Sequence, residues 1–68
     1  MISPAVAWVA ATAAEGRTPV RVEAPYVHHA ALVAAGFAPE APRPERPDHI
    51  VVTDMDGVEW AANVPTVW

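Results

Sequence analysis

The N-terminal part of the chain is almost entirely apolar and predicts a helix over residues 4–15. Ser3-Pro4 favours a helix start, because serine is a common capping residue and proline is tolerated in the first turn. Gly16 fits the left-handed position at which many helices end. Glu15 is the only charged residue of this segment, so we expect the helix to be buried on every side.

A short alternating segment follows the first helix. Residues 20–23 alternate between valine and charged residues, and this period of two predicts a strand with Val20 and Val22 facing the interior. Pro19 favours a position at the start of a strand or at the edge of a sheet.

Residues 25–35 predict a second, shorter helix. Gly36 fits a left-handed helix end, and we expect Phe37 to fold back onto Leu32 in a Schellman motif. Because so short a helix is marginal alone, we expect tertiary packing to hold it. One apolar stripe along this helix joins Tyr26, Ala30, Val33 and Phe37.

Residues 38–47 contain four of the eight prolines of the chain. Proline-rich segments favour an extended backbone that rises by about 3.1 Å per residue, which predicts a semi-rigid strap of roughly 30 Å. The strap separates a helix–strand–helix half (1–37) from a strand-rich half (48–68). Two PxxP spacings occur in it, but we interpret the strap as an arm that lies on a neighbouring subunit rather than as a ligand for an SH3-type groove.

Residues 48–68 predict a β-hairpin with an extended tail. Residues 50–53 are rich in β-branched side chains, residues 58–62 return, and Asp56-Gly57 between them is a strong turn signal. Residues 64–68 contain a proline, which favours an edge strand or an extended tail.

Two registers are compatible with this turn signal. A two-residue turn places Thr53 opposite Trp60 and gives one coherent apolar face, but it also sets Asp54 opposite Glu59, and like charges across a ladder repel each other. A longer turn over residues 54–57 relieves the repulsion and rearranges the faces. We favour the two-residue register.

Together the elements predict one small α+β domain, or an assembly-dependent fold. It contains two short helices with a short strand and a C-terminal β-hairpin, joined by the proline-rich strap. Below roughly 70–80 residues one hydrophobic core seldom supplies more than about 3–5 kcal/mol. The chain has 68 residues and no cysteine, so disulfides and thiolate zinc sites are excluded. A protein partner is the remaining source of extra stability.

Charge and hydropathy exclude further classes. The net charge is −4, with four arginines as the only permanent cations, so we expect no direct contact with nucleic acid. No apolar run reaches the roughly 20 residues of a transmembrane helix, so we expect no membrane partner. The first positive charge is Arg17, which comes too late for the basic region of a secretory signal, and a cytoplasmic origin is therefore expected.

Candidate catalytic and metal-binding chemistry is sparse. Asp54, Asp56 and Glu59 surround a glycine, but an EF-hand needs more oxygen ligands at fixed spacings, so we interpret these residues as part of a hairpin turn. His28 and His29 are adjacent and point about 100° apart on a helix, so they chelate one ion poorly. We assign no catalytic, cofactor-binding or metal site and expect no enzymatic activity.

Aromatic residues are the better candidates for a binding role. Trp and Tyr are enriched at interface hot spots, and three tryptophans in so short a chain cannot all lie centrally. We expect Trp8 or Trp68 to contact another chain. The predicted interface residues are Trp8, Val9, Tyr26, Phe37, Trp60, Val67 and Trp68.

One stretch of the chain carries a family resemblance. A strand at 18–23 precedes a short helix, and Leu32 to Phe37 matches the pattern Leu-x-x-x-Gly-aromatic, followed by Pro39-Glu40. This stretch resembles small virion-associated proteins that actinobacterial phages encode near their structural genes. The resemblance covers about a third of the chain, implies a role in the capsid or the head–tail region, and transfers no catalytic or binding residue.

These observations predict a non-enzymatic structural or accessory protein that acts by assembly. Its expected partners are copies of itself or a larger structural protein, in a virion or in the host cytoplasm, with residues 4–15 and 64–68 as docking elements. An alternative of another class is a small inhibitor that binds and blocks a host enzyme or defence factor. A third hypothesis is a metal-dependent oligomer held through His28, His29 and His49.

Overall fold

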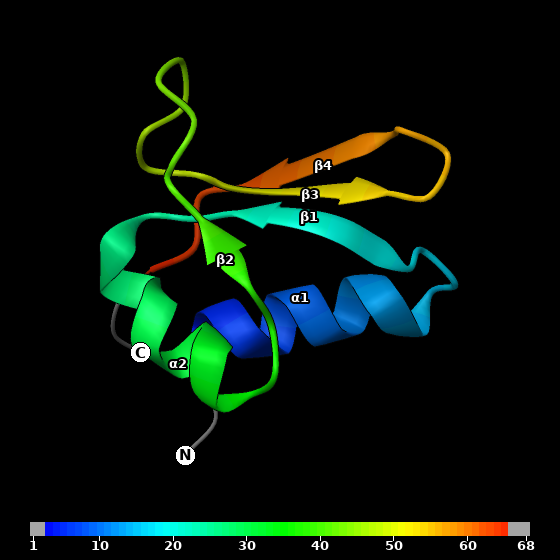
Figure 1. The fold of residues 1–68 in the computed structure, drawn as a ribbon, viewed down its shortest axis with the longest axis horizontal. Coiled ribbons are helices and arrows are strands. Elements are labelled where there is room, and N and C mark those ends of the chain that lie inside the picture. The colour runs from blue at the N-terminus through cyan, green and yellow to red at the C-terminus, as the bar shows by residue number, and fades with distance from the viewer. Residues whose placement is uncertain (1–2, 66–68) are drawn as a thin grey trace.

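The computed structural model describes residues 3–65. These residues form a four-stranded mixed sheet with helices on one face (Figure 1), which confirms the predicted α+β class. The helical elements are α1 (Pro4–Ala14), the 3-10 helix η1 (Tyr26–His28) and α2 (His29–Ala34). The strands are β1 (Pro19–Glu23), β2 (Pro39–Glu40), β3 (Ile50–Asp54) and β4 (Glu59–Ala62).

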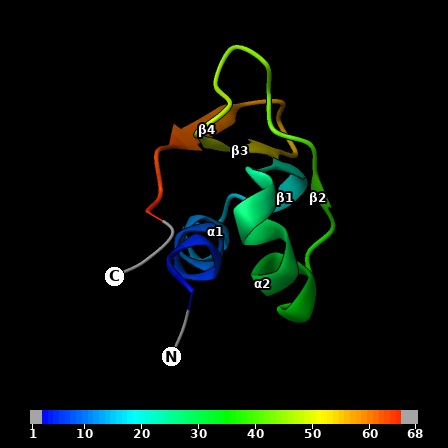
Figure 2. The same cartoon turned by 90° about the vertical axis from the view of Figure 1, so that its left-hand side faces the viewer.

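The strand order β2-β1-β3-β4 brings the two halves of the chain into one sheet. β1 pairs with β2 in parallel, through the connection that contains α2, and with β3 antiparallel. Figure 2 shows the helices beneath the sheet and residues 41–49 above it. The helix-covered side is called the inner face below, and the opposite side is the outer face.

The hydrophobic core lies between the inner face and α1 and α2. Val9 from α1, Leu32 from α2 and Val52 from β3 are fully buried and belong to one cluster. On α1 the buried positions Ala5, Val9 and Thr12 repeat at intervals of four and three residues, which places them on one side of the helix.

The opposite side of α1 is not covered by the described chain. Ala10, Ala11 and Ala14 are exposed, so the expectation that this helix is buried on every side is wrong. The reason is geometric, because a two-layer fold offers the helix only one sheet to pack on. The residues on its other side are small alanines, which are often exposed to solvent at little cost.

The second helical segment begins and ends as its sequence suggests. Its first turn is the 3-10 helix η1, and α2 continues from it. Gly36 has a φ of 96°, its N–H bonds to the Val33 carbonyl at 3.0 Å, and the Phe37 N–H bonds to the Leu32 carbonyl at 2.9 Å. This pair of bonds is the predicted Schellman motif.

The predicted strand at 20–23 is present, but one of its two inward positions is wrong. Val22 is buried, whereas Val20 is 68% exposed. The pairing with β3 shifts between Pro19 and Arg21. Such an irregularity adds a residue to one strand and turns its side chain out of the regular alternation, so Val20 is directed away from the core.

The hairpin β3–β4 adopts the longer turn, and the two-residue register is wrong. Thr53 faces Glu59 and Val52 faces Trp60. The N–H of Gly57 bonds to the Asp54 carbonyl at 3.1 Å, and Gly57 has a φ of 80°. A type I turn followed by a left-handed glycine gives a three-residue loop, and this loop removes Asp54 from the position opposite Glu59.

The proline-rich strap is more compact than predicted. Pro39-Glu40 forms β2, which extends the sheet beyond β1. The remaining residues fold back: the Arg46 N–H bonds to the Arg43 carbonyl at 3.0 Å, and the His49 N–H bonds to the Arg46 carbonyl at 3.1 Å. The extended arm of roughly 30 Å is therefore wrong, because backbone pairing and successive turns use these residues inside the domain.

The chain closes its core without help from a partner. Its accessible surface is 4208 Å², and a monomeric protein of 7.2 kDa is expected to expose about 4,100 Å². A companion chain is thus not required to complete the interior. Any assembly has to use surfaces that this fold leaves exposed.

Candidate functional site

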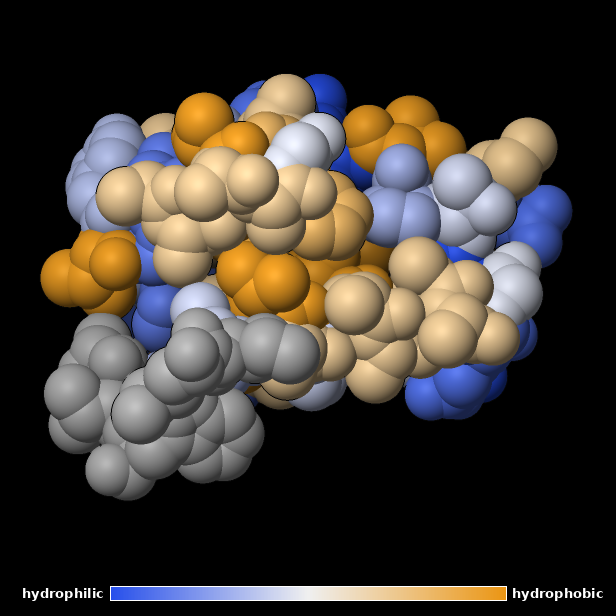
Figure 3. Space-filling model, turned by 90° about the horizontal axis from the view of Figure 1, so that it is seen from below, coloured by the Kyte–Doolittle hydropathy of each residue, from blue (hydrophilic) through white to orange (hydrophobic). Residues whose placement is uncertain are grey.

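An exposed apolar surface lies on the two helices. Figure 3 looks onto them and shows apolar colours over most of this side, with hydrophilic residues at its margins. We define the helix-layer face as the exposed residues of α1 and α2: Ala10, Ala11, Ala14, Ala30, Val33 and Ala34.

The helix-layer face carries no charge because its two helices contain almost no ionisable residues. No residue of α1 carries a charge, and His29 is the only ionisable residue of α2. The His29 ring is engaged elsewhere: its Nε2 lies 2.7 Å from the Ala24 carbonyl oxygen, and its ring stacks obliquely on Tyr26. Val33, 60% exposed, is the largest apolar side chain of the face.

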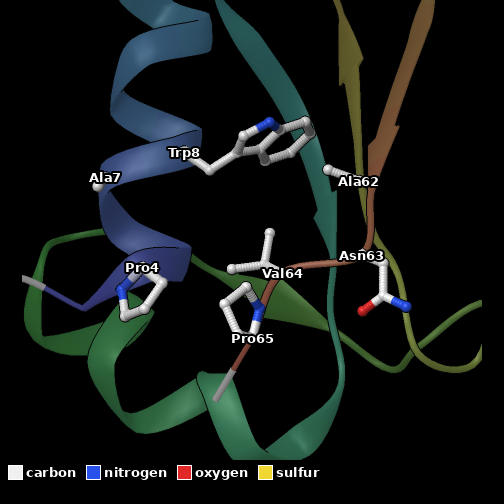
Figure 4. Close-up of a pocket in the computed structure, with 7 residues that line it drawn as sticks. All are labelled: Pro4, Ala7, Trp8, Ala62, Asn63, Val64 and Pro65. Carbon is white, nitrogen blue, oxygen red and sulfur yellow. The ribbon is translucent and has the colours of Figure 1, made fainter. Parts of the chain in front are cut away.

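An apolar groove of about 400 Å³ borders α1. It separates the start of α1 from the segment that follows β4. Figure 4 shows Trp8 and Ala62 on opposite sides of the groove, with Val64 between them. The lining residues are Pro4, Ala7, Trp8, Ala62, Asn63, Val64 and Pro65.

The seven predicted interface residues are not gathered on one surface. Trp8 lines the groove and is partly buried against the core. Tyr26 is 69% exposed at the start of η1, and Phe37 packs against the core from the end of α2. Val67 and Trp68 lie outside the described residues.

Two of these residues have other roles in the fold. Val9 is fully buried in the core, so its assignment to an exposed interface is wrong. It lies on the side of α1 that packs on the sheet. The sequence of α1 is apolar almost throughout and does not indicate which side of the helix that is. Trp60 is half-buried, with the guanidinium carbon of Arg17 3.7 Å from the centre of its ring. That contact has the geometry of a cation–π interaction.

The outer face of the sheet carries an ion cluster around Arg43. The Arg43 guanidinium donates to both carboxylate oxygens of Glu59, at 2.6 and 2.8 Å, and to Glu23 at 2.6 Å. Val51 lies beside it and is only 1% exposed. Arg43 therefore attaches the strap to β1 and β4 and helps to cover an apolar residue of β3.

The charge state of this cluster is fixed by its hydrogen bonds. The hydrogen bonds that Arg43 donates to Glu59 and Glu23 raise the pKa of Arg43. The hydrogen bond from Arg43 outweighs desolvation and lowers the pKa of Glu59. Arg43 and Glu59 therefore both stay ionised at neutral pH, and their ion pair is a tether between the strap and β4.

The carboxylates near the hairpin turn do not converge on a common point. Asp54 accepts from the backbone N–H groups of Asp56 and Val58, at 2.9 and 3.0 Å. Glu59 is bound by Arg43 on the outer face. The turn itself uses the Asp54 carboxylate, as Asx-type turns do.

The three histidines are also separate. His28, the last residue of η1, is buried, His29 bonds to the Ala24 carbonyl, and the Nδ1 of His49 lies 2.8 Å from an oxygen of Asp48. Within residues 3–65, no group of three or more potential metal-ligating side chains comes together. A metal site through these histidines would need ligands from a second chain.

Two features of the candidate surfaces escape sequence reasoning. Arg43 sits in a proline-rich segment that carries no signal for an ion pair with residues 16 and 20 positions away. The place of β4 at the edge of the sheet, among residues 3–65, depends on the strand order, which local patterning does not specify. The helix-layer face did have a signal, since the absence of charge in residues 4–14 is visible in the sequence.

Neither helix of residues 3–65 combines the length and the apolar character that a membrane crossing requires.

Comparison with known proteins finds no family model that matches this chain, and no significant match among curated proteins or solved structures.

Proposed function

We propose that this protein acts by assembly with other protein chains and has no enzymatic role. The observation that carries the proposal is the helix-layer face, an uncharged apolar surface on a domain that has already closed its core. Contiguous apolar surface on a small soluble domain is typical of a protein-binding site. Burying it stabilises a complex by roughly 25 cal/mol per Å².

The other surfaces support this choice. The outer face is covered by mutually paired charges, Arg43 with Glu23 and Glu59, and Arg21 with Glu40. Paired charges are already satisfied and offer little to a new partner. The helix-layer face has no such internal partners, so it gains most from contact with another chain.

The setting that we propose for this assembly is a phage virion, in the capsid or the head–tail region. The support is the resemblance of residues 18–40 to small virion-associated proteins of actinobacterial phages. Mass spectrometry of purified particles tests the setting. Many copies per particle are expected; absence from particles together with tight binding to one soluble host protein would instead favour an inhibitor.

The binding surface is tested by placing a charge on it. Val33→Glu adds a carboxylate to the helix-layer face, at an exposed position outside the core cluster. Met55→Glu is the matched control, because Met55 is also an exposed apolar residue, at 75%, but lies in the hairpin loop. Val33→Glu should lower incorporation into particles at least about tenfold, as expected when a charge is desolvated at an interface, and Met55→Glu should not. Equal incorporation of both variants would contradict the proposal.

A further inference from the structure

The two edges of the sheet differ in how they are protected. Edge strands expose unpaired backbone groups, and proteins commonly blunt them with short length, proline or charge. β2 is such an edge, because it has only two residues and one of them is Pro39. β4 forms the other edge, and within the described part of the chain β3 is its only neighbour.

The pairing of β3 and β4 defines which backbone groups of β4 are free. The Asp54 N–H bonds to the Val58 carbonyl at 2.9 Å, so these two residues form a hydrogen-bonded pair. Such pairs alternate along an antiparallel ladder. Trp60 and Ala62 therefore direct their N–H and C=O groups toward β3, whereas those of Glu59 and Ala61 point to the free edge.

Side chains at this edge do little to repel another strand. Ala61 is small and exposed on the outer face. Glu59 is the only charged residue of β4, and Arg43 neutralises it through two hydrogen bonds. No proline occurs between Glu59 and Asn63, so each of these residues has a backbone N–H that it can donate.

We propose that β4 pairs antiparallel with β4 of a second copy of this chain, about a two-fold axis at Ala61. The two four-stranded sheets then form one continuous sheet. This dimer uses a different surface from the helix-layer face, so it goes beyond the proposed function and leaves that face free for a larger partner.

The register follows from the outward groups. With the axis at Ala61, Ala61 faces its copy and Glu59 faces Asn63 of the second copy. Each facing pair can exchange two N–H···O bonds, and the small Ala61 side chains allow close approach at the axis. A carboxylate then lies opposite an uncharged amide, so this cross-strand pair carries no like-charge repulsion.

Other two-fold registers are less favourable. An axis at Glu59 sets two carboxylates opposite each other, and like charges across a ladder repel. An axis at Ala62 brings Pro65 opposite Glu59, and proline has no N–H to donate. An axis at Trp60 leaves only Glu59 and Ala61 to pair within the strand. A two-fold axis at Ala61 therefore gives the most favourable pairing of β4 with β4 of a second copy.

The inner face gains a contact in the same register. Trp60 of one copy lies opposite Ala62 of the other. Ala62 lines the apolar groove beside α1 (Figure 4), so the half-buried indole is brought toward that groove. The dimer therefore covers apolar surface in addition to satisfying backbone groups.

Substitutions at Ala61 test the dimer in the full chain. Ala61→Pro removes the outward N–H without removing a bond to β3. Ala61→Lys keeps the N–H but places two like charges at the axis, and it guards against a folding defect of the proline variant. Ala61→Ser is the matched control, because it keeps both the N–H and the small size.

Size-exclusion chromatography with light scattering supplies the measurement, with circular dichroism to verify folding. Wild type and Ala61→Ser should have twice the chain mass of 7.2 kDa at tens of micromolar. Ala61→Lys and Ala61→Pro should be monomers, or dimerise at least about tenfold more weakly. In the wild type, amide exchange at Ala61 should slow as the concentration rises.

The outcomes separate this proposal from the proposed function. A monomeric wild type, or a folded Ala61→Lys that dimerises like wild type, overturns the β4 pairing. Val33→Glu should leave the dimer intact; if it abolishes the dimer while Ala61→Lys does not, the helix-layer face is the self-association surface and the β4 pairing is wrong. Loss of particle incorporation in Val33→Glu tests the proposed function independently of either result.

Discussion

The indole Nε1 of Trp60 donates a hydrogen bond to Oδ2 of Asp54 at 3.3 Å, across the end of the β3–β4 hairpin. The other oxygen of Asp54 accepts from two backbone N–H groups of the turn. Arg17, from the loop between α1 and β1, stacks on the same indole. One carboxylate thus connects the turn, the sheet and the first loop.

Replacement of Asp54 should destabilise the hairpin. Asp54→Ala leaves the N–H groups of Asp56 and Val58 and the Trp60 indole without their acceptor. Because Asp54 is largely buried, we expect the melting temperature to fall by about 5–10 °C. Asp56→Ala is the control, since Asp56 is exposed, and thermal unfolding followed by circular dichroism compares the two. Equal shifts would contradict this role of Asp54.

Acid should destabilise the domain. Burial alone would raise the pKa of Asp54, but hydrogen bonds from Val58, Trp60 and Asp56 outweigh it and lower the pKa. The Arg43 hydrogen bond lowers the pKa of Glu59. A lowered folded-state pKa means that the unfolded chain binds protons more readily, so stability is complete above the ordinary values of 3.8 and 4.5 and is lost as the pH falls through the lower folded values.

Urea unfolding at pH 7 and pH 3 measures this acid loss. Asp54→Asn should reduce the difference between the two pH values, because it removes one of the linked carboxyls. A wild-type free energy of unfolding that is the same at both pH values would contradict the linkage.

Gly57 should tolerate asparagine better than alanine. Its φ of 80° lies in the left-handed region, and a Cβ there would meet no atom within 4 Å, so the cost is conformational. Gly57→Ala should lower the free energy of unfolding by about 1–2 kcal/mol. Gly57→Asn should cost less, since asparagine visits this region more readily. Chemical denaturation ranks the two variants; the reverse order would be inconsistent with the turn.

Adjacent residues of α2 should differ sharply in their effect on stability. Leu32 is fully buried, and Leu32→Ala should cost about 2–5 kcal/mol. That is comparable to the roughly 3–5 kcal/mol expected of a core this small, so this variant should be largely unfolded. Val33→Ala should change stability by less than about 0.5 kcal/mol, because Val33 is exposed. Circular dichroism and urea titration test the contrast, and similar losses at both positions would refute the packing.

Arg43 should control the opening of residues 41–49. Arg43→Ala removes three hydrogen bonds to Glu59 and Glu23, and the amides of Arg46 and His49 should then exchange roughly tenfold faster. Arg46→Ala is the control, since within residues 3–65 the Arg46 guanidinium forms no ion pair. Hydrogen exchange resolved by NMR supplies the comparison, and unchanged rates in Arg43→Ala would show that the ion pairs do not hold the segment.

Local signals account for the parts of the fold that sequence reasoning predicts well. α1 starts at Pro4 as predicted, although the Ser3 side chain forms no capping hydrogen bond, and the ends of α1 and α2 follow from Gly16 and from Gly36-Phe37. These motifs act over a few residues, so their outcome depends little on the rest of the chain. The positions of β1, β3 and β4 likewise follow from β-branched residues and the Asp-Gly turn.

Long-range pairing accounts for the parts that sequence reasoning misses. β2 has two residues, and only its pairing with Val22 and Glu23 of β1 makes it a strand. The register of β3–β4 depends on the partners of the Asp54 carboxylate. These are the backbone N–H groups of the turn and the indole of Trp60, which the sequence pattern does not reveal. Of the candidate site, the uncharged character of α1 was visible, whereas the side of α1 that packs on the sheet became clear only with the burial of Val9.

The central position of β1 and β3 makes the two chain halves mutually dependent. Val22, from the first half, lies directly opposite Val52, from the second, so neither piece keeps a closed interior if the other is removed. The segment that joins them crosses the outer face and takes no part in that interior. Cleavage there would turn one molecule into a split pair able to reassemble, a property suited to fragment-complementation reporters.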